Sequence, residues 1–531
     1  MKAKKYNPSR FVLMLVILPL TFNGILQSIA EPAAIVSTTS GLLKGHSSKG
    51  VMSFLGIPYG ADTGGQNRFL PPKPPEPWEN VRNAEKYGPQ CSHQKPPMYG
   101  DITKILIYSD LPTSEDCLSL NVWTPDVNTE EKRPVMVYLH GGGFFMGSSS
   151  DRYYEGGNLA RENDIVVVTL NHRLSVFGYF YLGPDAGPEY SSSGAVGMLD
   201  IVQALTWVRD NIAQFGGDPG NVTIFGQSGG GMKVSTVMAM PSANGLFHKA
   251  IIQSGPGRWL NTPKEASKLT ADILRKLNLT AADTKQLAAI PADKLLDAAS
   301  GGMRLIPVMG NNAIPVHPFA DSAPEQSARI PLLIGAMKDE STNSLLSDPE
   351  WRSMDEGTLK QRVAALVGKQ DAQKVIDMYQ SSAPNDPPQF IWASILSDSG
   401  FFNETYPLAD LKSEQPSSVY MYRVDWRSPV LGGIIRAAHA VDLPFVWDNV
   451  DVSEALVGKG PDQERMAQMM SRSFAEFARS GDPNVPGVIP KWPEYNKIDQ
   501  ATLIFDNQVR VENNPDQEKR AYWQAFKASS D

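Results

Sequence analysis

The sequence contains little cysteine and little histidine, which argues against a metal enzyme. Its 531 residues include two cysteines and seven histidines. No two histidines are spaced as HxxH, HxxxH or HExxH, and the two cysteines have no histidine at ligand spacing. We therefore expect no metal site.

Basic residues are also not in excess. Lysine and arginine total 49 and aspartate and glutamate total 57, so the formal charge is −8. This balance argues against a nucleic-acid partner, because nucleic-acid-binding proteins present a basic face to the phosphate backbone. The composition, 41% hydrophobic and 20% charged, is typical of a well-packed globular protein.

The apolar run near the N-terminus is shorter than a membrane-spanning helix requires, and polar residues interrupt the stretch that follows it. Four basic residues precede the run from Phe11 to Leu20, and small residues follow at Ser28 and Ala30. This is the layout of a secretory signal peptide, whereas a spanning helix needs about 20 apolar residues. We expect residues 1–30 to be a signal peptide, cleaved after Ala30, and residues 31–531 to form a single domain. The mature chain is then periplasmic or secreted, without stable membrane insertion.

The two cysteines fit export. Cys91 and Cys117 enclose 25 residues, and an exported protein with only two cysteines most simply pairs them. By the chain-entropy estimate, such a disulfide contributes about 3–4 kcal/mol.

Short β-branched runs alternate with longer helical patterns, which predicts an α/β fold. Residues 134–139 and 164–170 are apolar with little alternation, as expected for parallel strands covered on both faces. A helix is predicted over 197–215, ending at a Gly-Gly-Asp-Pro stop signal. The stretches 260–300 and 345–415 read as helical insertions covering the sheet.

The segment Gly226–Gly230 fits the pattern G-x-S-x-G, with a strand predicted before it and a helix over 232–240 after it. A serine on such a sharp strand-to-helix turn presents its hydroxyl outward, so Ser228 is the candidate nucleophile. A phosphate-binding loop is excluded, because Lys233 stands one place too late and no GxGxxG occurs.

A serine nucleophile needs a base that is oriented by an acid, and in this architecture the order is serine, acid, histidine. Asp339 and Glu340 follow the strand predicted at 331–335, and the residues alone do not separate them. Of His317 and His439, only His439 follows this pair, so it is the candidate base.

A glycine run after another strand is the candidate oxyanion hole. Residues 139–144 read Leu-His-Gly-Gly-Gly-Phe, which offers consecutive backbone N–H groups that no side chain shields. Each such donor typically supplies about 3–4 kcal/mol of transition-state stabilisation.

In these motifs the chain resembles the type-B carboxylesterases, a family of α/β-hydrolases that includes the cholinesterases. The resemblance runs from about residue 36 to 523. It is carried by the segments 54–60, 68–72, 114–122, 140–144, 171–173, 215–228, 438–445 and 480–484.

The resemblance implies a mostly parallel sheet with helices on both faces and helical insertions over the site. It implies Ser228 as nucleophile, Glu340 as acid and His439 as base. It also implies oxyanion donors from Gly142, Gly143 and Gly229, a disulfide between Cys91 and Cys117, and no cofactor.

Two residues depart from the family pattern, which usually has Glu before the serine and Ala after it. Gln227 removes a negative charge beside the nucleophile, which weakens attraction for cationic substrates. Gly229 keeps its N–H but is expected to loosen the backbone. The loop between the cysteines has Tyr99 and Tyr108 but no tryptophan to bind a choline cation.

We therefore expect a serine hydrolase that cleaves a small, neutral carboxylic ester through an acyl-enzyme. The alternatives are a non-catalytic, cholinesterase-like binding protein and an amidase or specialised natural-product esterase. The natural substrate and the oligomeric state stay open.

Overall fold

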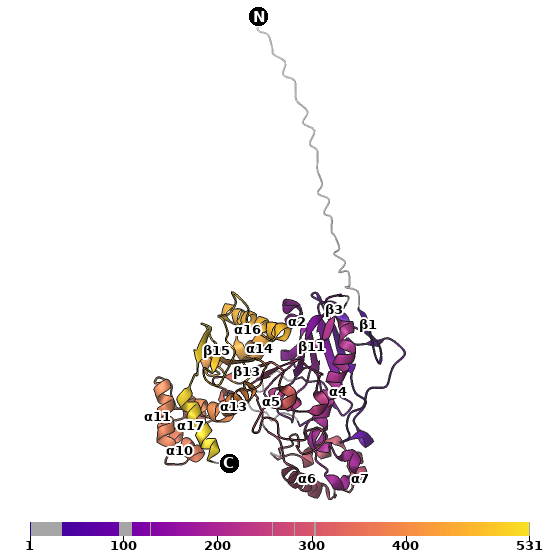
Figure 1. Cartoon of the computed structure of the whole chain (residues 1–531), viewed down its shortest axis with the longest axis horizontal. Helices are drawn as coiled ribbons and strands as arrows, with labels where there is room; N and C mark the ends of the chain where they lie inside the picture. Colours follow the sequence, from indigo (N-terminus) through magenta and orange to yellow (C-terminus); the bar gives the residue numbers. More distant parts are fainter. Residues whose placement is uncertain are drawn as a thin grey trace. The chain divides into compact units, whose positions relative to one another are not determined.

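The computed structural model describes residue 1 and residues 34–529, except 95–108, 128, 258, 281 and 302–303. Within these residues an eleven-stranded sheet forms the centre, in the order β16-β15-β14-β13-β12-β11-β9-β10-β8-β4-β3 (Figure 1). Pairing is parallel from β15 to β10 and antiparallel at both edges. The strands are β3 (His46–Ser48), β4 (Val51–Pro58), β8 (Ser119–Thr124), β9 (Arg133–Leu139), β10 (Val166–Leu170), β11 (Gly217–Gln227), β12 (Lys249–Gln253), β13 (Leu332–Met337), β14 (Val419–Val424), β15 (Ala501–Phe505) and β16 (Arg510–Asn513).

The central strands are buried on both faces, as their lack of alternation predicts. Along β9, Val135, Val137 and Leu139 pack into one hydrophobic core, while Met136 and Tyr138 pack into a second. Successive residues of a strand point to opposite faces, so each face of the sheet has its own core.

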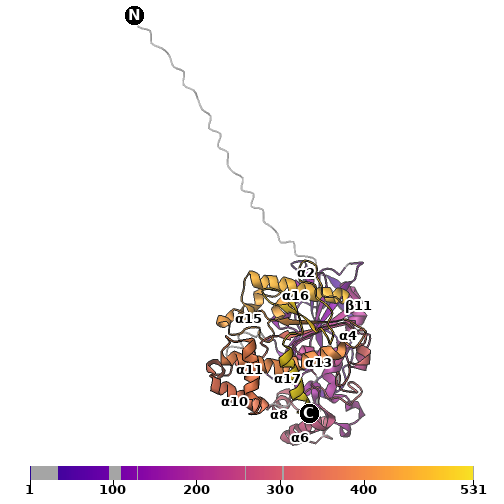
Figure 2. The same cartoon turned by 60° about the vertical axis from the view of Figure 1, so that its left-hand side comes forward.

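Helices pack on both faces of the sheet and contribute side chains to each core. Helix α4 contributes Met198 and Leu205 to the first core, and α16 contributes Met466 and Phe474 to the second. Figure 2 shows α16 beside α2, and α10, α11 and α17 gathered together. The helices are α2 (Gly157–Asn163), α3 (Ser175–Tyr179), α4 (Val196–Asn211), α5 (Gly229–Val237), α6 (Pro263–Leu277), α7 (Thr284–Ala289), α8 (Ala292–Ala298), α9 (Thr342–Leu345), α10 (Glu356–Val367), α11 (Ala372–Ser382), α12 (Pro388–Ser397), α13 (Asn403–Lys412), α14 (Leu443–Val446), α15 (Glu454–Val457), α16 (Pro461–Ser480) and α17 (Gln517–Ala528).

The expected helical insertions are present, and one of them reaches the candidate base. The first contains α6, α7 and α8, and the second contains α10 to α13 with a π-helical turn, η10 (Asp398–Phe402). The ring centroid of Phe401 on η10 lies 5.2 Å from that of His439.

The boundaries around Ser228 differ from the prediction. Strand β11 runs on to Gln227 and α5 begins at Gly229, so the turn is a single residue and the helix starts three residues early. The helix also ends at Val237 rather than at 240. The chain reverses at one residue because Ser228 takes a positive φ of 58°.

Cys91 and Cys117 form the expected disulfide, with their Cα atoms 4.9 Å apart. It joins β6 (Gln90–Cys91) to the segment just after β7 (Thr113–Ser114). Tyr99 and Tyr108 fall outside the described residues.

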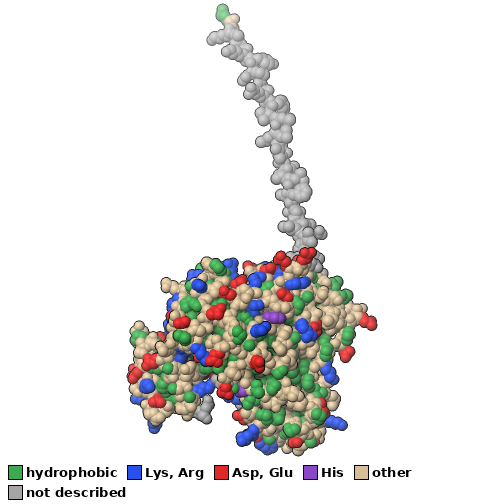
Figure 3. All heavy atoms as spheres, viewed as in Figure 1, with side chains coloured by type: hydrophobic (Ala, Val, Ile, Leu, Met, Phe, Trp, Pro, Cys, Tyr) green, Lys and Arg blue, Asp and Glu red, His purple; other side chains and the backbone are tan. Residues whose placement is uncertain are grey.

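Residues 33–531 cluster into one compact unit. The predicted signal peptide, 1–30, lies outside the described residues apart from residue 1. Among the helices that the structure describes, none is both long and apolar enough for a transmembrane span. On the face seen in Figure 3, lysine and arginine side chains are interspersed with aspartate and glutamate.

Candidate active site

Ser228 stands at the carboxyl end of β11, the edge where open parallel sheets place their sites. Its backbone is in a sparsely populated conformation, with φ 58° and ψ −124°, and its N–H donates to the carbonyl of Gln253 at 2.8 Å. The side chain is half-buried. Among the described residues, no hydrogen bond involves the Ser228 hydroxyl, so it is free to meet a substrate.

Glu340 and His439 are in direct contact. The Nδ1 atom of His439 lies 2.5 Å from Oε2 of Glu340, while Oε1 of Glu340 accepts the N–H of Met337 at 2.8 Å. Asp339, which the residues alone left as an equal candidate, turns instead toward the N–H of Ala437. The structure therefore brings Glu340 to the histidine.

The other ring nitrogen of His439 faces Gln227. The side-chain amide of Gln227 lies 3.1 Å from Nε2 of His439, and no hydrogen bond joins His439 to Ser228 in the described part of the chain. With its proton on Nδ1, shared with Glu340, the neutral ring accepts from Gln227 at Nε2. In this tautomer Nε2 carries no proton, which is what a general base requires, and the ring lies against Gln227, the residue before Ser228.

His317, the rejected candidate, has its Nδ1 atom 2.7 Å from the carbonyl of Pro318. The structure does not place it with Glu340.

Carboxylates set the pKa of His439. Burial lowers this pKa, but the charge and hydrogen bond of Glu340 and the charge of Asp442 outweigh it and raise the pKa above the ordinary 6.5. Burial also raises the pKa of Asp442 to about 6, although its hydrogen bond from Gln253 works the other way. Asp442 lies in the family-like segment 438–445, but nothing in the sequence indicated its role, because its partner Gln253 is distant in the chain.

The glycine loop after β9 packs directly on the start of α5. Gly142 and Gly143 have φ angles of 85° and 62°, a region that favours glycine. A Cβ atom on Gly229 would lie 2.3 Å from the carbonyl oxygen of Gly143 and 2.4 Å from its nitrogen. Gly229 therefore permits the close approach of this loop to α5.

The N–H groups of Gly142, Gly143 and Gly229 make no hydrogen bond within the described residues. They come from two segments that meet beside Ser228. This arrangement can bind a negatively charged oxygen.

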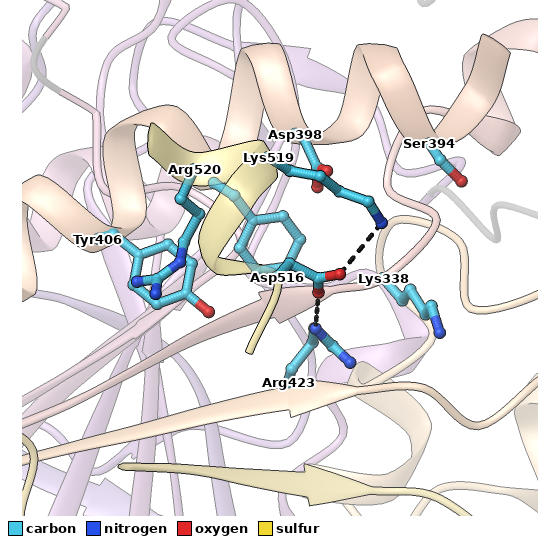
Figure 4. Close-up of a pocket in the computed structure, with 9 residues that line it drawn as sticks. Lys338, Ser394, Asp398, Tyr406, Arg423, Asp516, Lys519 and Arg520 are labelled. Atoms are coloured by element: carbon cyan, nitrogen blue, oxygen red, sulfur yellow. Dashed lines mark hydrogen bonds and ion pairs between the residues drawn. The ribbon is translucent and has the colours of Figure 1, made fainter. Parts of the chain in front are cut away.

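A cavity lined by charged side chains lies between β14 and α17. Figure 4 shows Asp516 between Arg423 of β14 and Lys519 of α17, with Lys338 nearby. Asp516 is 2.5 Å from Arg423 and 3.0 Å from Lys519. Although burial opposes ionisation, these two cations hold the pKa of Asp516 at about 2. The charges are paired with one another and join α17 to β14.

Comparison with known proteins shows the family of this chain. A family model described as the carboxylesterase family matches residues 32–523. The chain is 36% identical over 500 residues to the para-nitrobenzyl esterase of Bacillus subtilis, covering 92% of this chain and 97% of that one. It is 30% identical to the phenmedipham hydrolase of Pseudarthrobacter oxydans, covering 89% and 95%.

A solved carboxylesterase of Geobacillus stearothermophilus superposes with a TM-score of 0.81 at 37% identity, covering 92% of this chain and all of that one. The sheet with helices on both faces is the α/β-hydrolase fold. The chain therefore belongs to the carboxylesterase family and is a serine hydrolase that cleaves carboxylic esters.

Proposed function

We propose that Ser228, His439 and Glu340 are the catalytic triad, and that the substrate is a neutral carboxylic ester. The contact that carries the proposal is the 2.5 Å pair of His439 and Glu340, whose imidazole lies against the residue next to Ser228. A base oriented by a buried acid is what a serine nucleophile needs.

In the first half-reaction, Ser228 Oγ attacks the ester carbonyl carbon and its proton passes to Nε2 of His439. In this step the serine hydroxyl replaces the amide of Gln227 as the hydrogen-bond partner of Nε2. Glu340 stabilises the resulting imidazolium, and the N–H groups of Gly142, Gly143 and Gly229 bind the oxyanion.

The alcohol then leaves with the proton from His439, and an acyl-enzyme remains on Ser228. A water molecule gives its proton to His439 and attacks the acyl carbon. Collapse of the second tetrahedral intermediate returns the proton to Ser228 Oγ and releases the acid.

The neutral side chain of Gln227 supports a neutral substrate. It is buried beside the nucleophile, where the family usually carries a glutamate. One relative is named for a para-nitrobenzyl ester, which fits this class.

The pH dependence tests the role of His439. Only the neutral imidazole accepts a proton, so kcat/KM should fall as the pH drops through the pKa of His439. We expect the midpoint of this acid limb above pH 6.5. Asp442→Asn removes one charge that raises this pKa, so the midpoint should move to lower pH. The plateau of kcat/KM at high pH should stay within about threefold of that of the unaltered enzyme, because asparagine still accepts the hydrogen bond from Gln253.

Asp448→Asn is the matched control. Burial raises the pKa of Asp448 to about 6 as well, but it does not act on His439. A midpoint that is unchanged in Asp442→Asn, or equally displaced in both variants, would contradict the proposal.

We also propose that residues 1–30 direct export and are removed. The disulfide Cys91–Cys117 supports an oxidising destination. N-terminal sequencing of the chain recovered from the periplasm or medium should begin at Glu31. A cell-associated chain that retains residues 1–30 would show that the segment is an anchor.

A further inference from the structure

Lys233 is a buried lysine on α5, five residues after Ser228. Its relative exposure is 0%, and its Nζ atom donates to the carbonyl of His140 at 2.9 Å and of Gly143 at 2.7 Å. Nζ also lies 5.4 Å from the ring centroid of Phe144. All three contacts are made to the glycine loop after β9.

The two carbonyls bracket the candidate oxyanion donors. The carbonyl of His140 belongs to the peptide that precedes Gly141, and the carbonyl of Gly143 to the peptide that follows Gly143. Between them lie the peptides that carry the N–H groups of Gly142 and Gly143. Glycines are conformationally permissive, so this loop needs an external anchor to hold both donors in one direction.

Lys233 has no acidic partner within the described residues; both of its hydrogen-bond partners are backbone carbonyls. Burial lowers its pKa to about 7. The titratable groups that respond to its charge are the stacked rings of His140 and His172, whose pKa values burial lowers first and Lys233 lowers further. Burying an amine without a carboxylate partner is costly for stability, which points to a role beyond packing.

We propose that Lys233 is a positioning residue for the oxyanion hole, acting by holding the carbonyls of His140 and Gly143. Helix α5 then carries the nucleophile at its start, the N–H of Gly229 in its first turn, and the anchor of the other two donors on its next turn. The inference rests on the proposed role of Gly142, Gly143 and Gly229.

Lys233→Met keeps the length of the side chain but removes both hydrogen bonds. With p-nitrophenyl acetate, kcat should fall by about 10²-fold while KM changes little, because the loss concerns the transition state. An aryl trifluoromethyl ketone tests the oxyanion directly. Ser228 Oγ adds to its carbonyl carbon while the serine proton passes to Nε2 of His439, which forms a hemiketal oxyanion. Its Ki should therefore rise by about the same factor as kcat falls.

Lys412→Met is the matched control. Lys412 is also fully buried, burial lowers its pKa to about 8, and it donates to the hydroxyl of Ser417 in the segment between α13 and β14. This variant should lose stability without losing kcat or affinity for the ketone. Lys233→Gln retains an N–H donor for one carbonyl and should recover part of both losses.

The inference fails if Lys233→Met, or Lys233→Gln should the methionine variant not fold, binds the ketone as tightly as Lys412→Met does. If the unaltered enzyme itself is not inhibited by the ketone, the proposed function fails instead. The two failures are therefore separable.

Discussion

Replacing Ser228 with alanine is expected to lower kcat/KM for p-nitrophenyl acetate by about 10⁶-fold, with little change in the thermal midpoint. The variant loses only the oxygen that forms the acyl-enzyme. Alanine keeps the Cβ atom, so the backbone at φ 58° has the same steric demand as before. The measurement is initial-rate kinetics together with thermal unfolding.

An organophosphate provides a second readout of the same change. It should label the unaltered enzyme on the peptide that contains Ser228 and leave Ser228→Ala unlabelled. Ser235→Ala is the control on the same helix, because its hydroxyl donates to backbone carbonyls such as that of Gly257. It should cost about 1 kcal/mol of stability and keep its turnover. Near-normal turnover in Ser228→Ala would show that Ser228 is not the nucleophile.

Gly229→Ala is expected to lower kcat by about 10²- to 10³-fold with a smaller change in KM. The added Cβ would lie 2.3 Å from the carbonyl oxygen of Gly143, so the loop must move. That oxygen also accepts from Lys233, and the movement breaks this bond and turns the N–H of Gly143 away from the site. Alanine is the usual family residue here, so the prediction is specific to this chain.

Gly357→Ala is the control for glycine replacement. Gly357 is exposed in the first turn of α10, and the nearest atom to an added Cβ is 3.5 Å away. It should keep both kcat and stability, because alanine favours a helix. If Gly229→Ala retains full kcat, the glycine loop does not need its close approach to α5.

The main strands and the α/β order were predictable because local patterns report them. A strand with an uninterrupted apolar run, such as 134–139, buries all its side chains only inside a sheet that is covered on both faces. The boundaries at Ser228 were not predictable, because three glycines suggest a turn. They open α5 instead, and they are packed closely against the end of β9 and the loop after it: a Cβ on Gly230 would lie 1.9 Å from the carbonyl oxygen of Leu139.

Chain order and motif chemistry were enough to name Ser228, His439 and the glycine loop as candidates. They left Asp339 and Glu340 as equal candidates for the acid. Two adjacent residues fit the same chain order, and they differ only in the direction in which their side chains point. Packing separates them: one carboxylate turns toward Ala437 and the other toward His439.

Residue types and their order therefore establish the α/β architecture, the family and the candidate nucleophile, since each depends on short stretches whose chemistry is local. Two contacts arise only when the chain is folded. Gln227 contacts His439, which is 212 positions away in the sequence, and Lys233 donates to the carbonyl of Gly143, which is 90 positions away. Sequence separation carries no information about distance in space, and the direction of a side chain is set by everything packed around it.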